Sequence, residues 1–108
     1  EIVVIGVLTV AVVPLVEELV FRGLFLRGAL RAFEGAGRRL GPALAVVLTG
    51  IAFGLAHLEA LETLGLAAFG MVLAYLAYRA GRLGPSILAH ATFNLVAIVS
   101  VATVRPGW

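Results

Sequence analysis

The chain has 108 residues, of which 62% are hydrophobic and 13% charged, and its mean hydropathy of +1.13 excludes an ordinary soluble domain. The net charge of +2 includes eight arginines and no lysine. In so apolar a chain, this favours arginines at the ends of membrane helices and argues against a nucleic-acid partner. The absence of cysteine excludes disulfide bonds, thiolate metal ligands and cysteine nucleophiles.

The first predicted helix runs from about residue 2 to about residue 30. Residues 2–16 carry no charge, and Pro14 is expected to kink the helix because it removes one backbone hydrogen bond. Glu17 and Glu18 follow directly. Ionisable groups at bilayer depth cost at least a few kcal/mol each and normally face a protein interior, a water-filled cavity or a partner charge. The two acids therefore predict a functional site.

Helical spacing gives the two acids different surroundings. Glu18 and Arg22 stand one turn apart, at the i, i+4 spacing that favours an ion pair. Glu17 is rotated from Glu18 by about 100° and lies five positions from Arg22, so its carboxylate can stay free. The spacing predicts a structural ion pair between Glu18 and Arg22, and it leaves Glu17 as a candidate base.

The second predicted helix covers residues 42–58 and the third covers residues 63–79. Gly50 and Gly54 form a small-xxx-small pair that lets a neighbouring helix approach closely. His57 follows on the same side of the second helix and is expected to face protein rather than lipid. The third helix has no ionisable group in its interior, so we expect it to serve packing alone.

The fourth predicted helix covers residues 85–104. Ser86, His90 and Asn94 recur at intervals of four, so they form one polar stripe on an otherwise apolar helix. Four apolar helices with short connections predict an all-α, polytopic membrane helix bundle, because helices are the spanning form that this pattern permits. We expect a multi-pass protein of the cell membrane.

The polar residues of these apolar helices suit one reaction. A carboxylate can take a proton from water, and imidazole and amide groups can donate hydrogen bonds to the oxyanion that forms when water attacks a carbonyl. Simpler roles also exist for each residue. His57 could lie at a membrane interface, and His90 with Asn94 could hydrogen-bond a neighbouring helix.

Three ordered motifs resemble those of the CAAX prenyl protease and bacteriocin-processing family of intramembrane proteases: Glu17-Glu18-x-x-x-Arg22, Phe53-x-x-x-His57 and His90-x-x-x-Asn94. The resemblance implies a membrane-embedded endopeptidase, whose eukaryotic relatives remove the last three residues of prenylated CAAX proteins. It also implies that the chain, residues 1–108, is the protease core domain of a larger protein that starts before Glu1.

The resemblance assigns roles to the motif residues. Glu17 and His57 correspond to the residues that activate water, and His90 and Asn94 correspond to the oxyanion hole. Glu18 and Arg22 fall on the second glutamate and the arginine of the first motif. The implied partners are the lipid bilayer and a peptide or protein substrate, lipidated or not. No cofactor is expected.

Other functions remain open at this stage. Zinc could be held by Glu17, His57 and His90, which are acceptable ligands for a catalytic ion with one open position. A non-catalytic immunity or scaffold protein could bind a peptide in the same cavity. A transporter fragment could use buried charges, although the chain lacks the internal repeat of many transporter folds.

The depths of the two histidines in the membrane conflict when the helices are counted from the cytoplasmic side. His57 lies about 22 Å from Pro42, whereas His90 lies only about 8 Å from Pro85. A shared site requires the connection before Pro85 to dip into the membrane, where irregular backbone is tolerated if it is buried in protein or lines a water-filled cavity. This predicts that Ser86 lines an aqueous path to the site.

Overall fold

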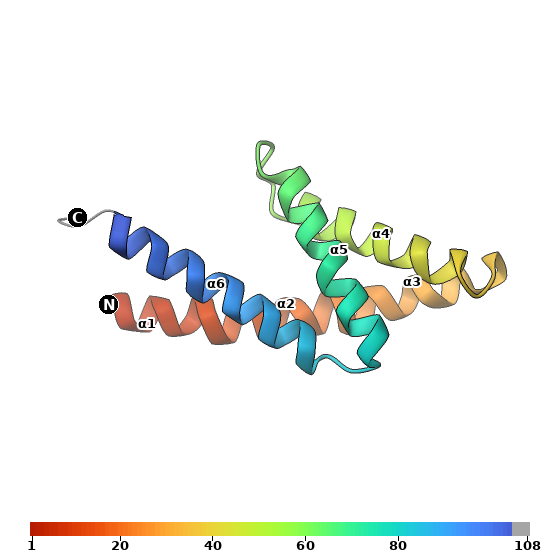
Figure 1. The fold of residues 1–108 in the computed structure, drawn as a ribbon, viewed down its shortest axis with the longest axis horizontal. Coiled ribbons are helices and arrows are strands. Elements are labelled where there is room, and N and C mark those ends of the chain that lie inside the picture. Colours follow the sequence, from red (N-terminus) through yellow and green to blue (C-terminus); the bar gives the residue numbers. More distant parts are fainter. Residues whose placement is uncertain (105–108) are drawn as a thin grey trace.

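The computed structural model describes residues 1–104, which fold into helices joined by short connections, with no strand in that part of the chain (Figure 1). The elements are α1 (Ile2–Val7), η1 (Leu8–Val12), α2 (Val13–Glu18), η2 (Leu19–Phe25), α3 (Leu26–Ala32), η3 (Glu34–Ala36), α4 (Leu40–Ala56), α5 (Thr63–Ala80) and α6 (Gly84–Val104). Elements η1 and η2 are π-helical, and η3 is a 3₁₀ turn. The all-α prediction is confirmed.

The first predicted helix is a continuous rod, Ile2–Ala32, called here the long helix. The helix continues through Pro14, where the sequence predicts a kink, and the π-helical segment η1 ends two residues before that proline. The second predicted helix, residues 42–58, is shifted: α4 begins at Leu40 and ends at Ala56. His57 therefore caps α4 and does not belong to its last turn.

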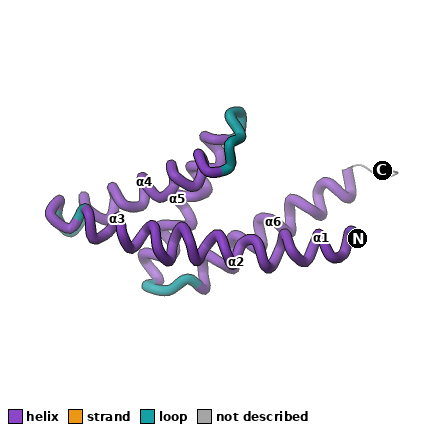
Figure 2. The backbone as a smooth tube through the Cα atoms, turned by 180° about the vertical axis from the view of Figure 1, so that it is seen from behind, coloured by secondary structure: helices purple, strands orange, loops and turns teal. Residues whose placement is uncertain are grey.

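The other three helices pack along the long helix. Helix α4 runs antiparallel to α3 at one end, α6 lies beside α1, η1 and α2 at the other end, and α5 crosses between them (Figures 1 and 2). The connection between α4 and α5 lies away from the long helix, and the connection between α5 and α6 lies close to its middle (Figure 1). This path brings α2, the end of α4 and the middle of α6 together.

Glycines set the contact between α4 and α5. A Cβ atom on Gly54 would lie 2.8 Å from the carbonyl oxygen of Thr63 and 2.9 Å from the backbone nitrogen of Ala67. A Cβ atom on Gly50 would lie 2.7 Å from the carbonyl oxygen of Ala67, and one on Gly70 would lie 3.1 Å from the Cα atom of Gly50. The backbones of the two helices thus touch, as the small-xxx-small pair predicts.

Helix α6 starts beside the long helix, away from its end. After α5, Gly81 adopts a left-handed φ of +68° and turns the chain, and Leu83 then packs on the long helix, with its Cδ1 atom 3.5 Å from the place of a Cβ atom on Gly23. Gly23 lies about 14 Å before Ala32 along the helix axis. Helix α6 therefore begins beside the middle of the long helix, as a shared site for the two histidines requires.

The outer surface is apolar. Among residues 1–104, three helices are long and apolar enough to cross a membrane: the long helix, α5 and α6. Helix α4 has 17 residues. It is therefore about 25 Å long, shorter than the roughly 30 Å hydrocarbon core of a bilayer. Large apolar side chains such as Leu24 and Leu88 are mostly exposed. A surface of this kind suits lipid rather than water, so the chain is a membrane protein.

The substitution Gly54→Ala should destabilise the bundle by about 1 to 3 kcal/mol, because its methyl group meets backbone atoms of α5 that cannot move alone. Thermal unfolding of the full-length protein in mild detergent measures the effect. The matched control is Gly65→Ala in α5, where a Cβ atom meets no heavy atom within 4 Å. Equal unfolding temperatures for Gly54→Ala and the wild type would contradict this close contact.

Candidate active site

Three of the predicted site residues meet at one point. The carboxylate of Glu17, on α2, faces two imidazole rings that come from different helices. His57 Nε2 lies 3.4 Å from Glu17 Oε2, and His90 Nε2 lies 3.4 Å from Glu17 Oε1. His57 caps α4, and His90 lies in the second turn of α6. The structure thus brings both histidines to the same carboxylate despite their separation in the sequence.

The site has an accessible side and a closed side. The side chains of Glu17 and His57 are 25% and 28% exposed, whereas that of His90 is 4% exposed. Glu18 and Arg22 are fully buried behind them. Water and a substrate can therefore reach Glu17 and His57, while Glu18 and Arg22 are confined to contacts with protein.

The carboxylate of Glu18 accepts hydrogen bonds from both Arg22 and His90. Arg22 Nη1 donates to Glu18 Oε2 at 3.1 Å, which is the contact that the i, i+4 spacing predicts. His90 Nδ1 donates to the same oxygen at 2.8 Å. The sequence does not predict this second contact, which links the closed side of the site to the ring that faces Glu17.

Arg22 finds its other partners on α4 and α5. Its Nη2 atom donates to the carbonyl oxygen of Gly70 at 2.9 Å, and its guanidinium carbon lies 4.4 Å from the centroid of the Phe53 ring. A cation over the face of an aromatic ring is attracted by the ring quadrupole, most strongly when both are shielded from water. Arg22 thus fixes the long helix against both neighbouring helices.

The hydrogen bonds assign the proton on each neutral histidine ring. His57 Nδ1 lies 2.7 Å from the carbonyl oxygen of Phe53, which can only accept, so Nδ1 carries the proton. His90 Nδ1 faces the carboxylate of Glu18 in the same way. In each neutral ring Nε2 is then an acceptor directed at Glu17, itself an acceptor. At each of these 3.4 Å contacts, a water bound beside both atoms could donate a hydrogen to each of them.

Aromatic rings hold His90 edge-on. Its centroid lies 5.7 Å from those of Phe53 and Phe69, with interplanar angles of 79° and 83°. Phe69 also stacks on Phe93 at 4.2 Å. The expectation that the helix carrying Phe69 serves packing alone is incomplete, because this helix supplies both that ring and the Gly70 carbonyl. The sequence could not identify these two contacts, because Phe69 is distinguished only by being aromatic and every residue has a backbone carbonyl.

Asn94 has a partner outside this cluster. Its Nδ2 atom donates to the carbonyl oxygen of Thr9 at 2.9 Å. In the π-helical segment η1, Val13 N–H bonds the carbonyl of Leu8 instead of that of Thr9, and the following residue, Pro14, has no N–H. The Thr9 carbonyl therefore accepts no hydrogen bond from the backbone of residue 13 or 14. The side-chain amide of Asn94 donates to it instead.

The prediction for Ser86 is wrong. Its side chain is fully buried, and its hydroxyl donates to the carbonyl oxygen of Leu83 at 3.0 Å. The cause is local: near the start of a helix, a serine hydroxyl can bond a nearby backbone carbonyl, and this turns it away from any aqueous path.

The zinc alternative gains no support from the arrangement of side chains. Within the described residues, no group of three or more His, Cys, Asp or Glu side chains is arranged to hold a metal ion. The two histidines face different oxygens of Glu17. Both rings and this carboxylate lie together.

The chain matches a protein-family model. The family model of the type II CAAX prenyl endopeptidases, described as Rce1-like, matches residues 1–96. This range includes all six motif residues named above as catalytic or ion-paired. Comparison with curated proteins and with solved structures gave no match.

Removing one member of the buried pair should destabilise the protein. The substitutions Glu18→Ala and Arg22→Ala each strand a buried charge, at a cost of about 3 to 5 kcal/mol. We expect a lower yield of folded protein and a lower unfolding temperature, both measured on the full-length protein in detergent. Glu17→Gln, which changes a partly exposed carboxylate next to the pair, is the matched control and should keep nearly wild-type yield. The opposite ranking would mean that the two glutamates have exchanged roles.

Proposed function

The chain belongs to the Rce1-like family of type II CAAX prenyl endopeptidases, and from this membership we propose that it is an intramembrane endopeptidase in which Glu17 and His57 activate water. The observation that carries the proposal is the approach of His57 and His90 to the two oxygens of one partly exposed carboxylate. We place the protein in the cell membrane as a multi-pass protein.

The first step is the attack of water on the peptide carbonyl. Glu17 Oε2 and Nε2 of a neutral His57 ring are two acceptors 3.4 Å apart, so a water bound beside both atoms can donate one hydrogen to each. Its lone pair is then free to attack the carbonyl carbon. Glu17 takes a proton from the attacking water and later delivers it to the leaving nitrogen as the C–N bond breaks.

The negative charge that forms on the carbonyl oxygen needs donors. His90 can donate from Nε2 when that nitrogen carries a proton, and Glu18 accepts a hydrogen bond from Nδ1 of the same ring. Asn94 uses one N–H for the Thr9 carbonyl, and its amide has a second. We assign these two donors to the oxyanion hole, the kind of site whose single donors are worth about 10² to 10³ in rate.

A hollow beside Asn94 offers a place for the substrate. It lies between the start of the long helix and α6, has a volume of about 360 Å³, and is lined by Thr9, Asn94 and apolar side chains. A peptide bound there would have its carbonyl groups within reach of Asn94 and its apolar groups against the two helices. This supports a peptide or protein substrate with an apolar segment, such as a lipidated chain.

The substitution Glu17→Gln should abolish turnover, with a loss of about 100-fold or more, because general-base catalysis typically contributes 10² to 10⁴. Cleavage of a fluorogenic peptide library by the full-length protein in proteoliposomes measures the effect, and His57→Ala should reduce it similarly. The control is Glu59→Gln, which removes an exposed acid from the connection between α4 and α5. Unchanged cleavage by Glu17→Gln would overturn the mechanism, and no cleavage by any form would favour a non-catalytic scaffold.

Cleavage should also be independent of metal. We propose that Glu17, His57 and His90 act as acid–base groups and not as zinc ligands. Treatment of the active protein with a strong chelator, followed by dialysis, should leave the rate unchanged, and metal analysis should find no stoichiometric zinc. One zinc per chain, with activity lost on stripping and regained on adding zinc, would replace this mechanism with a zinc-dependent one.

A further inference from the structure

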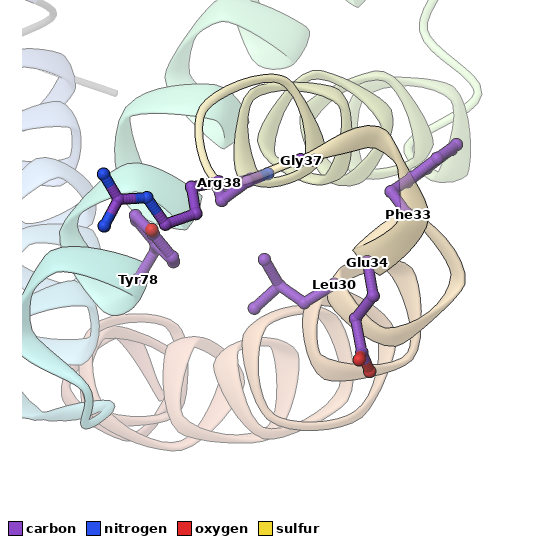
Figure 3. Close-up of a pocket in the computed structure, with 8 residues that line it drawn as sticks. Leu30, Phe33, Glu34, Gly37, Arg38 and Tyr78 are labelled. Carbon is purple, nitrogen blue, oxygen red and sulfur yellow. The ribbon is translucent and has the colours of Figure 1, made fainter.

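A groove with an arginine rim lies between α4 and α5, at the end of the bundle where the long helix joins α4. It has a volume of about 430 Å³. Its wall combines aliphatic side chains with two tyrosines, and the residues used below are Arg38, Arg39, Pro42, Val47, Tyr75 and Tyr78. A second hollow of about 460 Å³ adjoins it and shares Arg38, Pro42 and Tyr78 (Figure 3).

The arginines at this groove carry uncompensated charge. No ion pair among the described residues involves Arg38, Arg39 or Arg79. Arg79 lies with its guanidinium carbon 6.0 Å from the ring centroid of Tyr75, which lines the groove. The nearest acid in the adjoining hollow, Glu34, points away from Arg38 (Figure 3). Two arginines thus line the apolar groove, and a third lies near Tyr75 on its wall.

The chemistry of the groove changes along its length. One part carries positive charge, and the other is lined by the aliphatic side chains of α4, including Val47, and by tyrosine rings. Tyrosines and arginines are typical of the level where lipid headgroups meet the hydrocarbon core. Basic pockets between membrane helices bind the headgroups of anionic lipids. The combination of charge, aromatic rings and an apolar wall matches a lipid better than it matches a free anion.

We propose that this groove binds one anionic phospholipid, with the phosphate at Arg38 and Arg39 and an acyl chain along α4 and the rings of Tyr75 and Tyr78. The site uses none of the residues assigned to peptide cleavage, so it does not depend on the proposed function. An arginine near an anionic headgroup strengthens binding by about fivefold, so two arginines contribute roughly 25-fold.

Native mass spectrometry of the full-length protein, titrated with phosphatidylglycerol or with phosphatidylcholine of the same chains, tests the proposal. The wild type should bind phosphatidylglycerol more tightly. The double substitution Arg38→Gln with Arg39→Gln should weaken that binding roughly 25-fold and remove the preference. The matched control, Arg27→Gln with Arg31→Gln, removes two charges from the same end of the bundle, outside this groove, and should keep the preference. Val47→Trp, at a position 43% exposed, fills the groove without changing charge and should weaken both lipids.

Three results would overturn the proposal. An equal loss in the control would mean that binding follows net charge and not the groove. Displacement of phosphatidylglycerol by millimolar inorganic phosphate, with no effect of Val47→Trp, would mean that the arginines hold an anion without an acyl chain. Lipid binding that none of the variants changes would mean that another segment of the full-length protein covers the groove. If the double variant fails to fold, Val47→Trp and the phosphate competition still decide.

Discussion

The ion pair between Glu18 and Arg22 lies fully buried in a chain that is otherwise strongly apolar, and the other helices supply part of its contacts, since Glu18 Oε1 and Arg22 Nε have no hydrogen-bond partner among the described residues. A buried charge is costly unless it is paired and hydrogen-bonded inside the protein. Arg22 reaches the Gly70 carbonyl on α5 and the Phe53 ring on α4, and Glu18 reaches His90 on α6. One pair on the long helix thereby makes a polar or cation–π contact with each of the other three helices.

Two neighbouring residues thus have different roles: Glu18 contributes to stability, and Glu17 is the proposed catalytic base. Glu18 is closed off from solvent and oriented by two donors, whereas Glu17 is partly exposed and faces two ring nitrogens. His90 belongs to both sets, since one ring nitrogen contacts Glu18 and the other faces Glu17. Substitution of Glu18 would therefore remove an acceptor that orients the His90 ring, as well as lower the stability of the bundle.

The sequence predicts the parts that depend on local pattern. Uncharged runs give the four helices, and the i, i+4 spacing gives the contact of Glu18 with Arg22. It does not predict the contact of Glu18 with His90, because that depends on where α6 meets the long helix, which Leu83 and Gly23 determine. The prediction for Ser86 fails for a related reason. Polar residues at intervals of four share one helix face, but this spacing does not show which of them bonds a nearby backbone carbonyl.

The length of α4 has a consequence for the supply of water. A helix of about 25 Å is too short for a hydrocarbon core of roughly 30 Å, and a bilayer adapts to such a mismatch by thinning around it. His57 caps the end of this helix, where Leu58 takes a positive φ of 55° and turns the chain out of the helix. Thinning at that end would draw the polar headgroup layer toward His57. In the proposed mechanism the reactant water would then cross less hydrocarbon, so the rate of the proposed hydrolysis would depend on the thickness of the host bilayer.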